Sequence, residues 1–279
     1  MAYIPKKVAT RFVKELGKWQ KVLQTAKDRD INEADTVTII KDLLANIFGY
    51  DKYTELTSEF AIRGTFVDLA VKIGNAVKYL IEVKAIGMDL NDNHLRQALD
   101  YGANHGIDWV VLTNGAIWRI YKIRFDKPIT SEFICELDLL TMNPRQEKTQ
   151  QMLFLLCKEG WNKSVIDDYH SYRKVVNKFV IGALVLNQPV LDLIKRELRR
   201  LSPDVRVDSS EIEEILKTDV LKREVIEGEM ADQASSLVKK GKQRDRKKRE
   251  ETKEQKKQEI IQIAPSQEIH RDNSTELPS

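Results

Sequence analysis

The sequence holds few of the residues that mark disulfide-rich, zinc-binding or membrane-spanning proteins. Among its 279 residues there are two cysteines and four histidines. Cys135 and Cys157 do not have a metal-ligand or redox spacing, and the histidines do not have a zinc spacing. The longest apolar run covers 179–186, far fewer than the roughly 20 residues of a membrane helix. We therefore expect a soluble, cytoplasmic protein with reduced cysteines and no membrane partner.

A phosphate-binding loop of the form GxxxxGK[ST] is also absent, so we expect no ATP-driven motor within these residues. The net charge is only +3, but it is unevenly distributed. Between 239 and 257 there are 11 basic and 4 acidic residues, whereas residues 1–238 carry a net charge of −1. Any affinity of the first 238 residues for nucleic acid must therefore come from a local patch.

The spacing of apolar residues changes from helical to alternating and back along the first half of the chain. Asn32 has the chemistry of a helix N-cap, and Asn114-Gly115 is a strong hairpin signal. The order helix, helix, strand, strand, helix, strand, strand predicts an α/β domain with a mixed central sheet flanked by helices. The predicted helices are 6–27, 32–49 and 91–105, and the predicted strands are 58–73, 77–86 and two segments of 108–123.

After Pro144 the strands give way to helical spacing. We expect an α/β domain at 1–143, a helical region at 144–232 for partner or dimer contact, and a tail at 233–279. The tail is basic and then polar and has almost no aromatic residues, so we expect it to be disordered or a solvated single helix. Its basic part can be a solvated mixed-charge segment or a phosphate-binding arm, and the sequence favours neither.

The predicted strand at 77–86 carries an acid and a base, Glu82 and Lys84, among apolar residues. A two-residue turn before this strand would place Asp68 opposite Ile81, so that the two carboxylates point to opposite faces. A three-residue loop at 74–76, or a single β-bulge, would instead pair Asp68 with Glu82. We predict the odd loop or the bulge, because only this register brings the two acids together.

Two carboxylates from adjacent strands suit a hard divalent cation such as Mg²⁺, and a neighbouring ammonium suits phosphodiester hydrolysis. The alternative is structural: Asp, Glu and Lys beside strands are most often exposed residues on the solvated face of an antiparallel sheet.

The pattern Asp-x13-Glu-x-Lys across a hairpin resembles the core of the PD-(D/E)xK nucleases. More narrowly, residues 33–140 resemble the N-terminal nuclease domain of type I restriction enzyme R subunits. The resemblance implies a restriction-endonuclease-like fold for 1–143. It implies that Asp68, Glu82 and Lys84 are catalytic, and that the two acids and the backbone carbonyl of Val83 bind the metal.

The resemblance also implies roles for three further residues. Gln97 and Tyr101 match a QxxxY motif that orients DNA or supports the lysine. Glu59 matches an upstream acid that often completes the metal shell, with Glu55 as a weaker substitute.

The function expected is a DNA endonuclease of restriction-modification or phage defence, dependent on Mg²⁺, which Mn²⁺ can replace. One alternative is a non-catalytic DNA-binding or regulatory module that retains the nuclease fold. Another is an accessory nuclease subunit that works with a separate ATPase or specificity subunit. One such core reaches one strand, so cutting both strands requires a homodimer or two events.

Overall fold

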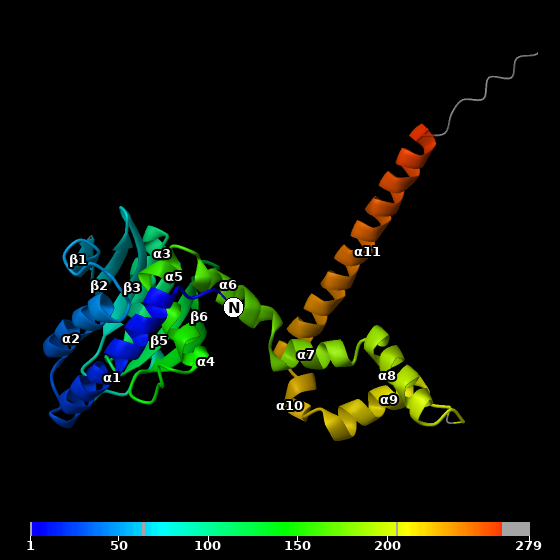
Figure 1. Cartoon of the computed structure of the whole chain (residues 1–279), viewed down its shortest axis with the longest axis horizontal. Helices are drawn as coiled ribbons and strands as arrows, with labels where there is room; N and C mark the ends of the chain where they lie inside the picture. The colour runs from blue at the N-terminus through cyan, green and yellow to red at the C-terminus, as the bar shows by residue number, and fades with distance from the viewer. Residues whose placement is uncertain (1, 63–64, 205, 264–279) are drawn as a thin grey trace, which may run out of the picture. The chain divides into compact units, whose positions relative to one another are not determined.

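The computed structural model describes residues 2–62, 65–204 and 206–263, without the side chains at 59–62, 65–66, 246, 248–249, 253 and 255–263. The chain divides into two compact units, Met1–Lys174 and Val175–Ser279. The first is an α/β unit and the second is helical (Figure 1).

The first unit is built on a mixed sheet that has six strands among the described residues, in the order β1-β2-β3-β4-β5-β6. Neighbouring strands are antiparallel except for β3 and β4, which are parallel. The connection between β3 and β4 contains a helix, as the sequence predicted. The strands are β1 (Leu56–Ile62), β2 (Thr65–Ile73), β3 (Ala76–Val83), β4 (Trp109–Thr113), β5 (Ile117–Arg124) and β6 (Thr130–Asp138).

Two strand predictions were incomplete. The segment 58–73, expected to be one strand, forms most of the antiparallel pair β1 and β2. The strand β6 was not predicted, because it lacks strict alternation: two adjacent residues, Ile134 and Cys135, are both buried. A register shift between Ile120 and Tyr121, where β5 pairs with β6, accounts for this break in the pattern.

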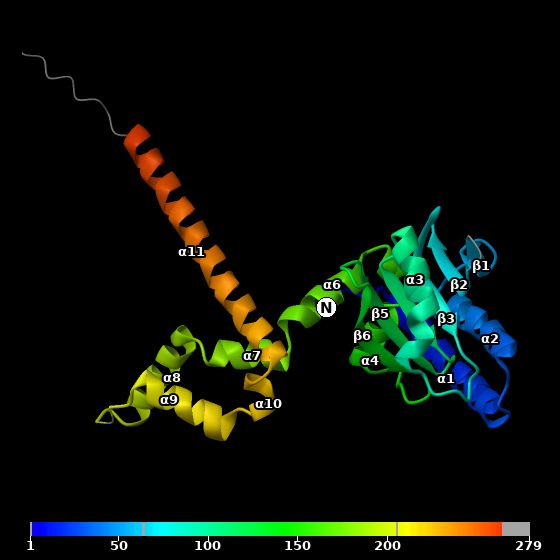
Figure 2. The same ribbon diagram turned by 180° about the vertical axis from the view of Figure 1, so that it is seen from behind.

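Helices cover both faces of the sheet. Figure 1 looks onto the face covered by α1 (Lys6–Asp28) and α2 (Glu33–Asn46). Figure 2 shows the other face, where the crossover helix α3 (Arg96–His105) follows a short 3-10 turn. Two predicted helix ends are confirmed: the Asn32 side chain accepts a hydrogen bond from the N–H of Asp35, and Gly106 caps α3 with a φ of 66°. Two other ends differ: α2 stops at Asn46 instead of 49, and the α-helical part of the predicted 91–105 helix begins at Arg96.

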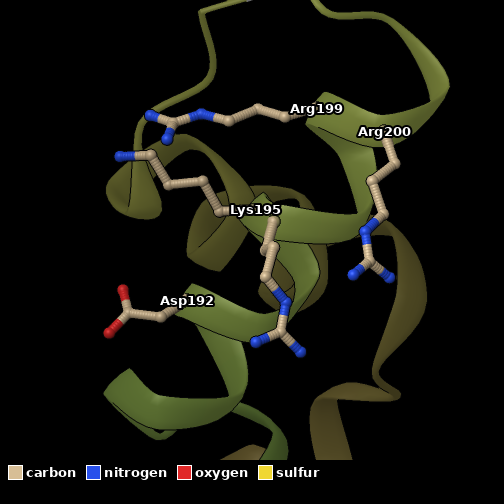
Figure 3. Close-up of a pocket in the computed structure, with 5 residues that line it drawn as sticks. Asp192, Lys195, Arg199 and Arg200 are labelled. Atoms are coloured by element: carbon tan, nitrogen blue, oxygen red, sulfur yellow. The ribbon is translucent and has the colours of Figure 1, made fainter.

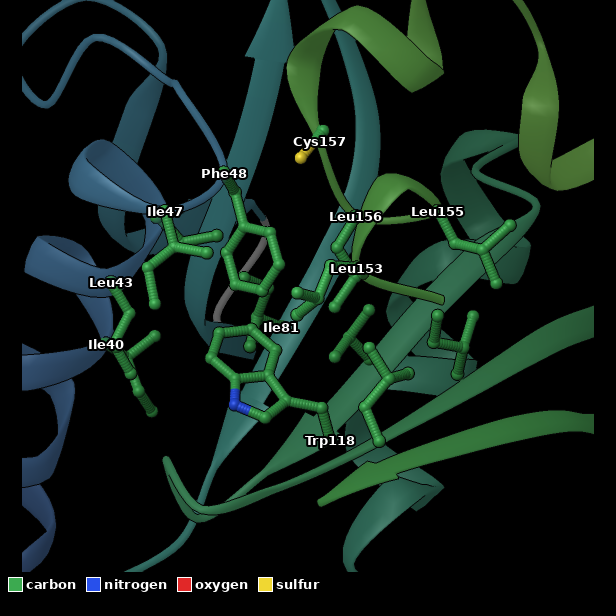
Figure 4. Close-up of a cluster of buried hydrophobic side chains, with 14 of the residues drawn as sticks. Ile40, Leu43, Ile47, Phe48, Ile81, Trp118, Leu153, Leu155, Leu156 and Cys157 are labelled. Atoms are coloured by element: carbon green, nitrogen blue, oxygen red, sulfur yellow. The ribbon is translucent and has the colours of Figure 1, made fainter. Parts of the chain in front are cut away.

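The larger of two hydrophobic cores lies between α1, α2 and the sheet. Phe48 and Trp118 form its centre, with ring centroids 5.3 Å apart (Figure 4). Residues of α4 (Glu147–Phe154) and α5 (Lys158–Trp161) and the segment between them pack into the same core. The first unit therefore continues past the expected boundary at 143 to Lys174, because this segment completes its core.

Gly102 allows α3 to lie close to the sheet. A Cβ atom there would lie 2.4 Å from Cδ1 of Ile123 and 3.0 Å from the carbonyl oxygen of Ile107. We expect Gly102→Ala to destabilise the first unit by about 1–3 kcal/mol, because the backbone contact cannot relax. All four tryptophans lie in this unit, so urea unfolding followed by tryptophan fluorescence measures the change.

Gly17→Ala in α1 is the matched control. A Cβ atom at Gly17 has no neighbour within 4 Å, so alanine should stabilise that helix by about 0.5–1 kcal/mol. Equal effects of the two substitutions would contradict the close approach of α3.

The second unit consists of helices. The helix α6 (Val165–Val175) ends at the boundary between the units. It is followed by α7 (Lys178–Val185), α8 (Gln188–Leu201), α9 (Ser209–Ile215), a π-helical turn (Leu216–Val220), α10 (Arg223–Ile226) and α11 (Glu229–Ile263). Of the two forms expected for the tail from 233, disordered or a single helix, the structure shows the helix to Ile263, and 264–279 lie outside the described residues. Within the described ranges, none of these helices is both long enough and apolar enough to span a bilayer.

Candidate active site

The hairpin of β2 and β3 contains the predicted register change. Ile73 pairs with Ala76 across a two-residue turn, but beyond a bulge Leu69 pairs with Ile81. The bulge lies between Val71 and Lys72 on β2, and it leaves one extra residue, Lys78, on β3. The prediction of an odd loop or a bulge is confirmed. Continued by one residue, this register places Asp68 opposite Glu82.

A hydrogen bond shows that Asp68 reaches the end of β3. Its Oδ2 atom accepts the backbone N–H of Val83 at 2.7 Å. The pairing of β2 with β3 ends at Leu69, so this side-chain contact of Asp68 lies just beyond the end of the strand pair. Ile81 and Val83 point into the larger core and leave Glu82 on the other face of the sheet.

Lys84 joins the acids at the carboxyl end of β3. Its ammonium donates to Oε1 of Glu82 and to the carbonyl oxygen of Val83, both at 2.8 Å. The side chains of Glu82 and Lys84 are 8% and 16% exposed, so the ion pair is largely shielded from water. Asp68, Glu82 and Lys84 therefore form one contiguous cluster.

A third acid, which the sequence did not single out, belongs to the cluster. Oε2 of Glu33 lies 3.6 Å from the Lys84 ammonium, and the Glu33 side chain is 48% exposed. Glu33 is the first residue of α2, where an acid is ordinarily explained by the helix dipole. The contact of Glu33 with Lys84 depends on the packing of α2 beside β3. The sequence therefore contains no signal that distinguishes Glu33 from an ordinary acid at a helix N-terminus.

The electrostatics of the cluster favour an added cation. Burial raises the pKa of Asp68, although the Val83 N–H and the charge of Lys84 oppose the rise. Burial also raises the pKa of Glu82, with further repulsion from Asp68 and Glu33, against the hydrogen bond from Lys84. Three carboxylates thus share one ammonium, which leaves two negative charges when all are ionised. One divalent cation would balance them.

Lys84 is held in its charged form. Burial alone would lower its pKa, but the hydrogen bond and attraction of Glu82, with the charges of Glu33 and Asp68, outweigh burial and raise it. The ammonium occupies two of the oxygens expected to bind metal, those of Glu82 and Val83.

The residues of the cluster offer ligand atoms of the type that Mg²⁺ prefers, but they are not arranged as a complete coordination shell. Asp68, Glu82, Glu33 and the carbonyl of Val83 offer only oxygen ligands, which hard cations prefer. Among the described residues, no three His, Cys, Asp or Glu side chains are arranged to hold a metal ion. Mg²⁺ commonly uses one or two carboxylates and several waters, so the site suits it once Lys84 leaves these oxygens.

The two residues of the QxxxY motif on α3, Gln97 and Tyr101, differ in burial. Gln97 is exposed, whereas Tyr101 is 1% exposed and stacks on His105 with ring centroids 4.5 Å apart. Burial raises the pKa of Tyr101. Tyr101 packs in the smaller core with Ala70 and other sheet residues. Gln97 is thus placed where it can reach a ligand, and Tyr101 is placed where it packs on the sheet; the expected roles of the pair, orienting DNA or supporting the lysine, stay predictions.

The structure describes the side chain of one of the two upstream acids, Glu55, but not that of the other, Glu59. The backbone of Glu59 lies in β1, but its side chain is outside the described residues. Oε1 of Glu55 forms an ion pair with Lys158 at 2.6 Å, and its Oε2 accepts the N–H of Asp51 at 2.8 Å. Glu55 is thus engaged in contacts of its own.

No protein-family model, curated protein or solved structure matches the chain. Any functional conclusion therefore depends on the geometry and charge of the cluster.

Proposed function

We propose that the chain is a Mg²⁺-dependent DNA endonuclease of the PD-(D/E)xK type. The observation that carries the proposal is the bulged register of β2 and β3. It brings Asp68 to the backbone of Val83, between Glu82 and Lys84. Three acids around one lysine, two of them with a pKa raised by burial, are a pattern that clusters at functional sites.

The architecture supports the proposal at a coarser level. A mixed sheet with helices on both faces, and a hairpin followed by a crossover helix, is compatible with a restriction-endonuclease-like core. The proposal extends to a role in restriction-modification or phage defence, as in the nuclease domain of type I R subunits. Fold alone does not establish this activity.

Each residue of the cluster has a defined task. The carboxylates of Asp68 and Glu82 and the carbonyl of Val83 would hold Mg²⁺ or Mn²⁺, with Glu33 in place of the upstream acid. The metal would supply Lewis-acid stabilisation of the phosphate and lower the pKa of a bound water. Lys84, released from Glu82, would orient the attacking water and offset negative charge on the phosphate. Gln97 would contact the DNA, and Tyr101 would fix α3.

The proposed partner is DNA, and a homodimer would supply a second core for the second strand. A chain without a P-loop would need a separate ATPase or specificity subunit for any ATP-driven step. The experiment that tests the proposal is cleavage of supercoiled plasmid with Mg²⁺, with Mn²⁺ and with EDTA. Nicking that requires the metal supports it, and metal-independent nicking or none overturns it.

A second candidate is a DNA-binding module that does not cleave. It is favoured by one observation: the Lys84 ammonium already neutralises Glu82 and contacts Val83, so the pair can be purely structural. DNA binding without nicking under either metal would select this candidate.

Glu33→Gln is a specific test of the third acid. We expect about a tenfold higher Mg²⁺ concentration for half-maximal nicking. The effect should be smaller than that of Glu82→Gln, because Glu33 is far more exposed. Asp35→Asn is the matched control, since Asp35 lies in the same first turn of α2. An equal shift in both variants would assign the effect to the helix dipole.

A further inference from the structure

The first residues of the helix α11 pack against another helix, and the residues that follow them are mostly charged. Ala231 and Ala234 are buried, and this end of α11 packs against α7. After Val238 the character changes: 239–249 contain eight basic residues and one acidic residue. At 1.5 Å per residue this run is about 16 Å long, and it carries a net charge of +7.

The basic side chains of this run that the structure describes are all exposed, namely those of Lys239, Lys240, Lys242, Arg244 and Lys247. Within the described part of the chain, none of these five forms an ion pair. Their spacing spreads them around more than half of the helix, at about 100° per residue. Like charges three and four positions apart destabilise a helix. The stability of α11 therefore does not explain why this run is basic.

The basic cluster of α8 differs in this respect. Lys195, Arg196, Arg199 and Arg200 surround a shallow hollow together with Asp192 (Figure 3). Several of these charges have acidic partners within the unit, with Lys195 at 3.6 Å from Asp208 and Arg200 at 2.9 Å from Glu197. The α8 charges are therefore partly neutralised, whereas the five described basic side chains of the α11 run have no ion-pair partner among the described residues.

The composition of the run also selects the kind of partner. Helices that bind anionic membranes insert an apolar face beside their basic residues. Between 239 and 257 there is no aliphatic or aromatic residue, so this segment has nothing to insert. What remains is a solvated positive charge over more than half of the helix, which suits the backbone of a nucleic acid.

We propose that the basic run of α11, residues 239–249, binds the phosphate backbone of DNA without regard to sequence. The near-neutral first unit would gain from α11 the affinity for DNA that its own net charge does not supply. The inference rests on the proposed function only in taking DNA as the polyanion. Binding through α11 does not require that the cluster of Asp68, Glu82 and Lys84 cleaves.

The test compares two variants of the full chain that lose the same charge. The α11 variant carries glutamine at Lys239, Lys240, Lys242 and Arg244. The matched control carries glutamine at four exposed lysines of α1, namely Lys6, Lys7, Lys21 and Lys27. Glutamine has nearly the helix propensity of lysine, and circular dichroism verifies that helix content is kept. Binding to a short fluorescein-labelled duplex is followed by anisotropy in EDTA, which prevents metal-dependent cleavage.

The α11 variant should bind about tenfold more weakly at ~100 mM salt, with a slope of log K against log salt smaller by about three. The control should stay within about twofold of the wild type. Equal weakening in both variants would overturn the proposal, because net charge alone would then explain binding. So would α11-dependent binding to phosphatidylserine vesicles together with unchanged DNA binding.

These outcomes are separable from the proposed function. If wild-type chain fails to nick plasmid but the α11 variant loses affinity as expected, the nuclease proposal falls and the α11 proposal stands. If nicking requires Mg²⁺ but the α11 variant binds like the control, the reverse holds.

Discussion

Replacing Lys84 with methionine should reduce Mg²⁺-dependent nicking of plasmid DNA by about 10²–10³-fold, the usual effect of removing one charge-stabilising group. Methionine keeps an unbranched apolar stem but lacks the ammonium that contacts Glu82 and Val83 at 2.8 Å. The measurement is the initial rate of nicking at saturating Mg²⁺. Robust nicking by the variant, unaffected by EDTA, would refute the role of Lys84.

Two further variants separate chemistry from folding. Lys78→Met removes the exposed lysine at the bulge of the same strand, outside the cluster, and should leave nicking unchanged. Lys84→Arg keeps the positive charge beside Glu82 but not the shape of an ammonium. Compared with Lys84→Met, this variant should recover more of the wild-type stability of the first unit than of the wild-type nicking rate. Urea unfolding followed by tryptophan fluorescence measures the stability. Equal recovery of both would make Lys84 a structural residue.

Asp68→Asn should stabilise the metal-free first unit and abolish its stabilisation by Mg²⁺. Asparagine can still accept the Val83 N–H through its amide oxygen, but it does not add a charge to the cluster. Removing a destabilising charge of this kind should raise the free energy of unfolding by about 1 kcal/mol, which corresponds to a rise of roughly 2–4 °C in Tm. For the wild type, Mg²⁺ at about 100 times its Kd should add ~2.7 kcal/mol, which the variant should lack.

The sign of the pH dependence follows from the direction of the shift. The pKa of Asp68 is raised in the folded chain, so the folded state binds more protons than the unfolded state between the two pKa values. Stability therefore falls as pH rises through this window, and the cost is fully present above the folded pKa. The gain from Asp68→Asn should be largest at neutral pH and shrink on acidification.

Asp138→Asn is the control for this effect. Asp138 is also half-buried on a strand of the sheet and accepts a backbone N–H, from Leu140, but it lies outside the cluster. It should neither stabilise the chain nor alter the response to Mg²⁺. Destabilisation by Asp68→Asn, with Mg²⁺ stabilisation retained, would contradict the metal site.

Features encoded by neighbouring residues were predictable. The helical spacing of α1, the Asn32 cap, the Gly106 terminus and the Asn114-Gly115 hairpin are all present. Each depends on the backbone preference of one residue or on the burial of one face of one segment. The same local reasoning found the two alternatives for the hairpin register, although it could not choose between them by energy.

Features that join distant segments were beyond the sequence. Glu33 and Lys84 are 51 positions apart, and their approach depends on how α2 packs on the sheet. Tyr101 was named from the resemblance to a QxxxY motif, and its burial in the smaller core could not be read from that motif. The boundary moved from 143 to 174 because α4 and α5 complete the larger core.

The sequence by itself determined the first two helices, the crossover helix, the mixed character of the sheet and the candidate residues on the β2–β3 hairpin, but not the split of 58–73 into two strands or the strand β6. Only the structure decided that the register changes by a bulge at Lys78 rather than by a longer loop, that Glu33 joins the cluster, and that the tail is a helix through Ile263 rather than disordered. The reason is physical. Local preferences are set by each residue and its neighbours, whereas a register is set by the burial of both sheet faces at once, and one extra residue exchanges the two faces.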